Sequence, residues 1–190
     1  MEKYNSKEKL KDHNKRRFNR KIVETLRRLK IRKGKAIVLD NRYLNTTLSL
    51  VKAGLKKENV SVPNPYDDYH RIKSKHKNTY KQLLGDYLTE FTDKVTVSIF
   101  DYCCSLDGNE KVNPLIDLQT YFENKIPTHN SFLSVTLSWR NKSKQAGTYS
   151  DFNRLVSKVT ELAHYNGYSA LLCPEGHSYK GMYYAFFHIL

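Results

Sequence analysis

The chain has 190 residues, of which 39% are hydrophobic, and its formal net charge is +14. This length and composition fit one folded domain with its own core, and they exclude a chain that is disordered throughout. No apolar run approaches the roughly 20 residues of a membrane span, and the charged N-terminus lacks the apolar core of a secretion signal. Three cysteines make no disulfide framework. The sequence therefore predicts an intracellular protein of the cytoplasm or nucleus.

The positive charge is concentrated in residues 1–35, which hold 15 lysines and arginines and 4 acidic residues, a net of +11. From Asn14 onward, apolar residues at helical spacing predict an amphipathic helix with one apolar stripe: Phe18, Ile22, Leu26 and Leu29. The stripe would dock on a domain over residues 36–190 and turn cations outward: Arg16, Arg17, Arg20, Lys21, Arg27 and Arg28. Such a basic arm favours a polyanionic partner, nucleic acid first, over a solubilising tail or an anionic membrane or protein.

The first half of the domain indicates strands that alternate with helices. Ala36–Asp40 is apolar up to its last residue, as buried parallel strands are. Asn45 or Thr46 would cap a helix that Gly54 ends. The further elements expected here are a strand over Val60–Val62, a polar helical turn within Tyr66–Lys77, a strand over Lys81–Leu84 and a helix over Asp86–Phe91.

The second half continues this alternation and then departs from it. The expected elements are a strand over Val95–Asp101, a helix that Asn113 caps, a strand over Phe132–Trp139 and a helix from Ser150 to Asn166. Two strands follow with no helix between them, Tyr168–Cys173 and Met182–Leu190. They should therefore form an antiparallel hairpin.

This order of elements predicts an α/β fold with a mostly parallel sheet, flanking helices and a C-terminal antiparallel hairpin. It resembles the Rossmann-like class I S-adenosylmethionine-dependent methyltransferases, whose last two strands form such a hairpin. The resemblance covers about residues 36–190 and rests on element order more than on motifs. The segments "VLDNRYLNTTLSLVKAGL", "VSVPNP" and "FDYCCSLDG" are also similar to methyltransferase-like proteins of large DNA viruses and protists.

The resemblance implies a site for S-adenosylmethionine across the carboxyl ends of the first strands, where ligands of open α/β sheets bind. By family position, Asp40 would lie beside the methionine portion, and the helix start at Asn45 and Thr46 would face the cofactor's carboxylate. Asn64 replaces the acid that usually binds the ribose hydroxyls. The remaining family positions are those of Asp86, near the adenine amino group, and of Asp101 and Tyr102, which face the methyl group and the acceptor.

The turn over residues 41–45 departs from the family because it contains no glycine. Glycines there let the backbone approach the cofactor closely. Arg42, Tyr43 and Leu44 fill this space instead. Either the loop swings away from the cofactor, or cofactor binding is weakened or lost.

The stretch Asp101–Gly108 carries the most reactive side chains. Asp101 would bind cofactor or act as a base, and Tyr102 would stack on a target base. The chain lacks the two prolines that adenine-N6 and cytosine-N4 methyltransferases have here. Cys103 or Cys104 could imitate the nucleophile of cytosine-C5 enzymes, although buried structural cysteines are commoner.

Two weaker patterns complete the candidates. A zinc site from Cys173, His177 and one of the paired cysteines rests on a single Cys-x3-His spacing, so no metal is expected. Trp139 and Arg140 end a strand and could line an acceptor pocket or pack within the sheet.

The leading functional hypothesis is methyl transfer from S-adenosylmethionine to nucleic acid. The first alternative is a nucleic-acid-binding module that keeps the fold without activity, which the glycine-free turn favours. The second is a related enzyme that acts on a protein or small molecule.

Overall fold

The computed structural model describes residues 13–66, 68–109, 111–138, 148–175, 177–179 and 182–190. The expected pocket residues Trp139 and Arg140 lie outside these ranges, as do the first 12 residues of the basic arm. Within the described ranges, none of the helices is both long and apolar enough to cross a membrane.

The eight described strands form one twisted sheet with a parallel half and an antiparallel end. The strand order along the sheet is β3 (Thr79–Tyr80), β2 (Val60–Pro63), β1 (Ala36–Val38), β4 (Val95–Asp101), β5 (Pro127–Ser138), β8 (Met182–Ile189), β6 (Ala170–Leu172). Neighbouring strands from β3 to β5 pair in parallel. Strand β8 pairs antiparallel with β5, with β6 and with β7 (His177–Tyr179). The predicted fold and the predicted terminal antiparallel pairing are confirmed.

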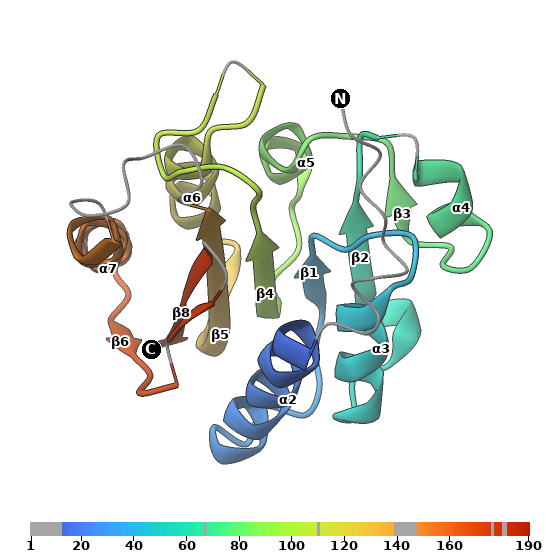
Figure 1. Ribbon diagram of the computed structural model, residues 1–190, viewed down its shortest axis with the longest axis horizontal. Coiled ribbons are helices and arrows are strands. Elements are labelled where there is room, and N and C mark those ends of the chain that lie inside the picture. The colour runs from blue at the N-terminus through green and yellow to red at the C-terminus, as the bar shows by residue number, and fades with distance from the viewer. Residues whose placement is uncertain (1–12, 67, 110, 139–147, 176, 180–181) are drawn as a thin grey trace.

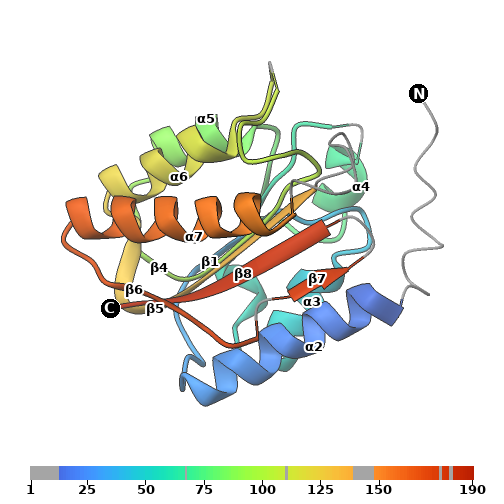
Figure 2. The same ribbon diagram turned by 60° about the vertical axis from the view of Figure 1, so that its left-hand side comes forward.

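Helices cover both faces of the sheet (Figures 1 and 2). On one face lie α2 (His13–Arg28) and α3 (Asn45–Lys52). On the other lie α5 (Leu84–Glu90), α6 (Pro114–Glu123) and α7 (Thr148–Tyr165). The short helix α4 (Tyr69–Lys73) lies beside β3, and a 3-10 turn, η1 (Lys57–Asn59), precedes β2.

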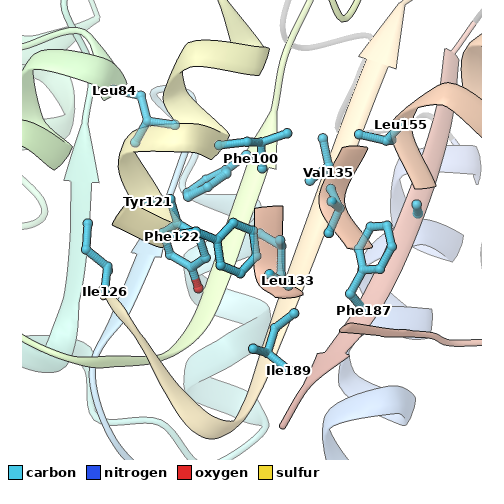
Figure 3. Close-up of a cluster of buried hydrophobic side chains, with 14 of the residues drawn as sticks. Leu84, Phe100, Tyr121, Phe122, Ile126, Leu133, Val135, Leu155, Phe187 and Ile189 are labelled. Carbon is cyan, nitrogen blue, oxygen red and sulfur yellow. The ribbon is translucent and has the colours of Figure 1, made fainter. Parts of the chain in front are cut away.

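The sheet separates two apolar cores because successive strand side chains point to opposite faces. On β4, Phe100 belongs to the core under α5–α7, whereas Val97 and Ile99 belong to the core under α2 and α3. Figure 3 shows the first core, in which Tyr121 and Phe122 of α6 meet strand side chains. Tyr121 also accepts a hydrogen bond, from the hydroxyl of Ser98 on β4, at 3.0 Å.

Helix α2 is anchored by the predicted stripe. Phe18, Ile22 and Leu26 are fully buried, and the ring of Phe18 packs edge-on against Tyr184 of β8 at 5.0 Å. Burying three such side chains contributes on the order of 5 kcal/mol relative to leaving them in water. The helix is thus part of the packed structure, while the division into an arm and a domain at residue 35 stays a prediction.

Two local expectations were wrong. The third strand is Thr79–Tyr80 rather than Lys81–Leu84, because β2 pairs through Val62 and Pro63 with these two residues. The N-cap of α3 is Leu44, in the left-handed conformation, rather than Asn45 or Thr46. Asn113 does cap α6, since its side chain accepts hydrogen bonds from the amides of Leu115 and Ile116.

Candidate functional site

The carboxyl ends of β1, β2 and β4 bring Asp40, Asn64 and Asp101 to one edge of the sheet. Val38 of β1 is level with Ile99 of β4, so Asp40, two residues after β1, and Asp101, the last residue of β4, lie at matching positions. The side-chain amide of Asn64 donates to the backbone oxygen of Asp40 at 3.1 Å. The three residues expected to share a site therefore lie next to one another.

The turn after β1 keeps a tight path without glycine. Leu44 has φ 55 and ψ 33, the left-handed conformation that glycine adopts at little cost. Its side chain is buried in the core under α2 and α3, which offsets the backbone strain. Asn41 stabilises the same turn, because its side-chain oxygen accepts a hydrogen bond from the amide of Tyr43 at 3.0 Å.

The N-terminus of α3 is already bonded to an anion, which is Asp40 itself. One carboxylate oxygen accepts from the amide of Thr47 at 2.8 Å, and the other accepts from the amide of Asn41 at 3.0 Å. Burial raises the pKa of Asp40, although these amides and the charge of Lys15 oppose that effect. The helix start therefore offers fewer free amides to a cofactor carboxylate than expected.

Two predicted cofactor contacts are occupied by other parts of the chain. Thr46 is buried, and its hydroxyl donates to the side chain of Asn19 on α2 at 3.3 Å. Asn64 donates to Asp40 and accepts from the amide of Tyr66 at 3.0 Å, so it ties the ends of β1 and β2 together. Asn45, at the first position of α3, is half-buried. A role of these three residues in cofactor binding stays a prediction.

Lys15 of α2 is the residue at this edge that sequence reasoning missed. Its ammonium donates to Asp101 Oδ2, and the two side chains are only 12% and 19% exposed. Burial by itself would lower the pKa of Lys15, but the opposing charges of Asp101 and Asp40 outweigh burial and raise it. A signal was present, since Lys15 lies three residues before Phe18 and thus on the apolar stripe.

Asp101 has acceptor capacity to spare. Its second oxygen, Oδ1, is buried and makes no hydrogen bond to any described residue. A buried carboxylate oxygen without a donor is costly. Asp101 therefore holds one ammonium group, that of Lys15, through Oδ2, and its Oδ1 could accept a hydrogen bond from a further donor. The ammonium group of a ligand could also take the place of that of Lys15.

The side chain of Tyr102 points into the core toward α6. It is buried, and its hydroxyl donates to Asp117 of α6 at 2.9 Å. Burial raises the pKa of Asp117 to about 6, and burial with the charge of Asp117 holds the pKa of Tyr102 well above 10. The structure does not support stacking of Tyr102 on a target base, because the residue next to Asp101 turns into the core.

Burial disfavours the reactive thiolate form of Cys104 and of Cys173. Burial raises the pKa of Cys104 to about 11, so its thiol stays protonated at neutral pH. Cys173 is buried on the other core, under α2, and burial raises its pKa as well. Within the described ranges, no three histidine, cysteine or acidic side chains gather as a metal site would require.

Asp86 lies apart from the cluster at the start of α5. It is exposed and lines a shallow hollow together with Pro65, which directly follows Asn64. The hollow therefore adjoins the predicted cofactor edge at the end of β2. The structure does not bring Asp86 into contact with Asp40 or Asp101, and its role near an adenine stays a prediction.

The predicted nucleic-acid cations divide into two groups. Arg16, Arg17, Arg20 and Arg27 are exposed on the outer face of α2. Arg28 instead makes a double hydrogen bond to the carboxylate of Glu175, at 2.9 and 3.0 Å. Lys21 donates to the backbone oxygen of Glu175 at 3.2 Å. The last two fasten α2 to the loop after β6.

No family model and no curated protein matches this chain. Solved structures do. A Bacteroides fragilis S-adenosylmethionine-dependent methyltransferase, determined with S-adenosyl-L-homocysteine, superposes with a TM-score of 0.54 at 12% identity, over 85% of this chain and 74% of that one. A Clostridium thermocellum protein provisionally named an rRNA methylase gives 0.54 at 13% identity, over 90% and 96%. The mitomycin 7-O-methyltransferase MmcR gives 0.51 at 9% identity, over 83% and 49%.

These likenesses establish the class I methyltransferase fold. At such identities they do not establish an activity, and the named acceptors differ between an rRNA and mitomycin. The similarity to proteins of large DNA viruses and protists has no support among the comparisons and stays a prediction.

Proposed function

We propose that this chain transfers a methyl group from S-adenosylmethionine to nucleic acid. The observation that carries the proposal is the convergence of two carboxylates, Asp40 and Asp101, around an ammonium group at the carboxyl ends of β1 and β4. In a sheet of this order, ligands bind at that edge. The cofactor's amino-acid portion carries an ammonium of the same kind, so the side-chain chemistry fits it.

In this proposal, Lys15 marks the place of the cofactor's ammonium. Asp101 would hold that group through the oxygen now bonded to Lys15, and its unpartnered Oδ1 would accept a second donor. Asp40 would add negative charge while it holds the 41–44 turn in place. When bound, the cofactor supplies an electrophilic methyl group, and the protein positions an acceptor atom beside it.

The positive charge of α2 is the reason to propose nucleic acid as the methyl acceptor. Four arginines lie exposed on α2, the helix whose Lys15 contacts Asp101. A polyanion on that helix would lie close to the carboxyl edge. Asp101 would take up a proton if the acceptor atom has to lose one.

Calorimetry with S-adenosylmethionine and with S-adenosyl-L-homocysteine tests the cofactor. Asp101→Ala should abolish binding, because it removes the carboxylate that receives the ammonium. Lys15→Met should strengthen binding, because it removes the competing ammonium while keeping a stem of similar shape. Asp93→Ala is the matched control, since Asp93 is an exposed carboxylate that pairs with Lys35 before β1. Absence of any heat at millimolar cofactor, for both the natural chain and Lys15→Met, contradicts the proposal.

A nucleic-acid-binding module without activity is the second candidate. The specific observation in its favour is that Lys15 fills the carboxyl edge and that the glycine-free turn places a buried leucine where the family has glycine. This candidate predicts nucleic-acid binding that is equal in the natural chain and in Asp101→Ala, together with no cofactor binding in either protein.

A further inference from the structure

The positive charge of the chain extends well beyond α2. Residues 13–81 hold 20 lysines and arginines and 5 acidic residues, a net of +15, whereas residues 82–190 hold 9 and 11, a net of −2. Residues 36–81 alone contribute +5. From residue 13 onward the chain therefore consists of a basic part, residues 13–81, and a slightly acidic part, residues 82–190.

This division corresponds to a division in space. The basic part comprises α2, α3, η1 and α4 with strands β1 to β3, and α2 and α3 cover one face of the sheet. The slightly acidic part includes α5, α6 and α7, which cover the opposite face (Figure 2). A polyanion would therefore be attracted to one side of the molecule and not to the other.

Five exposed cations gather around α4, and we call them the α4 basic surface: Lys57, Arg71, Lys73, Lys75 and Lys77. The ammonium of Lys57 donates to the backbone oxygen of Lys75 at 2.8 Å, which brings η1 against the segment after α4. Lys73 donates to the backbone oxygen of Thr79 at 3.1 Å. In the described part of the chain, none of the five forms an ion pair.

Lys57 and Lys73 are thus held by hydrogen bonds to uncharged carbonyl oxygens, and Asp68 at the start of α4 pairs with Arg42 instead of with any of the five cations. The field of the α4 basic surface reaches His76, whose pKa is lowered by burial first and then by Lys57 and Lys73. Like charges fixed close together repel one another, and a phosphate backbone would relieve this repulsion. The side chains of Arg71 and Lys77 are exposed and form no ion pair with any described residue, so both can meet a partner.

The α4 basic surface borders the same edge as the start of α2. Lys75 donates to the backbone oxygen of Arg42, in the turn that follows Asp40, at 3.2 Å. On the other side, Lys15 at the start of α2 contacts Asp101. The carboxyl edge with Asp40 and Asp101 therefore lies between two basic surfaces.

We infer that the α4 basic surface is a second docking site for nucleic-acid phosphates. A nucleic-acid strand bound to both the α4 basic surface and α2 would then cross the carboxyl edge. This inference rests on the proposal that the acceptor is nucleic acid, and it names where that acceptor lies. It also adds a phosphate contact outside residues 1–35, the basic arm that the sequence alone favours as the site for a polyanion. Phosphate contacts of this kind fix position and carry no sequence preference.

The test compares paired charge removals in the full chain. Arg71→Gln with Lys77→Gln changes the α4 basic surface. Lys111→Gln with Lys158→Gln removes the same charge from the slightly acidic part, where Lys111 is exposed and Lys158 is half-buried and pairs with Glu161 at 2.7 Å. Arg16→Gln with Arg17→Gln changes α2. Binding of a fluorescent single-stranded RNA and of a DNA of the same sequence is measured by anisotropy over a range of salt concentrations.

The α4 pair should weaken binding by on the order of tenfold near 0.1 M salt and reduce the log–log salt slope by about 1.4 to 1.8, since each phosphate contact contributes roughly 0.7 to 0.9. The Lys111 and Lys158 pair should change affinity less than about twofold. If the α4 pair binds as the natural chain does while the α2 pair is weakened, the second docking site is refuted and the proposed acceptor stands. If the natural chain binds neither RNA nor DNA, both fall, and the cofactor calorimetry still decides the methyltransferase proposal.

Discussion

The ion pair of Lys15 and Asp101 should contribute measurably to stability as well as to ligand binding. Exposed ion pairs contribute about 0 to 1 kcal/mol, whereas breaking a buried pair costs about 3 to 5 kcal/mol. With side chains 12% and 19% exposed, this pair lies nearer the buried limit. Gross attraction at 4 Å with an effective dielectric of 20 is about 4 kcal/mol, and desolvation removes part of it. We expect a coupling free energy of about 2 kcal/mol.

A double-mutant cycle measures that coupling. Lys15→Met, Asp101→Asn and the double variant are unfolded in urea at pH 7 without ligand, and the non-additive part of the free energy is the coupling. Arg20 and Glu24 of α2 are the matched control, because their pair is 71% and 57% exposed and spans 3.6 Å. Its coupling should stay below about 0.5 kcal/mol. A Lys15–Asp101 coupling equal to that of the control would refute the reasoning that the two charges form a buried unit.

Three further predictions concern residues around the same edge. Leu44→Gly should lower the free energy of unfolding by about 1 to 3 kcal/mol in urea, because lost burial exceeds the relief of left-handed strain, and a more stable variant would contradict this. Burial raises the pKa of Asp117 from 3.8 to about 6, so the folded protein favours the protonated carboxyl. The stability that this protonated carboxyl contributes is complete below pH 3.8 and is lost as pH rises through 6. The free energy of unfolding of Asp117→Asn in urea, relative to that of the natural chain, should therefore rise by about 2 to 3 kcal/mol from pH 3 to pH 7. A difference between the two proteins that does not change with pH would argue against this. With iodoacetamide at pH 7.5, Cys104 should react far more slowly than exposed Cys103, because its pKa is about 11, and mass spectrometry of the two labelled peptides measures the ratio.

Patterns that depend on neighbours in the sequence predicted the fold well. The α2 stripe, the cap at Asn113 and the strand over Val95–Asp101 each carry their signal within a few residues, and the structure has all three. The two-residue strand Thr79–Tyr80 has no period of its own, because pairing with β2 defines it. Its position could therefore not be taken from side-chain alternation.

The candidate site depended on contacts that the sequence does not display. Lys15 and Asp101 are 86 positions apart, and only the docking of α2 brings them together. The strand ends were enough to predict that Asp40 and Asp101 converge, since parallel strands end at one edge. They were not enough to orient Tyr102, because its direction is set by Asp117 on a later helix. Leu44 likewise takes a conformation in which a leucine is uncommon.

The position of β8 has a consequence for how the protein is made. All eight residues of β8 pair with β5 on one side, and three of them pair with β6 on the other, yet β8 is translated after every other strand of the described sheet. During synthesis, the parallel strands from β3 to β5 can assemble before β8 is made. Until β8 pairs with it, β5 is an edge strand whose outer row of backbone amides and carbonyls is unpaired. Chaperones that shield strand edges would act during that interval, and slower translation of the last segment would lengthen the time in which nascent chains can aggregate.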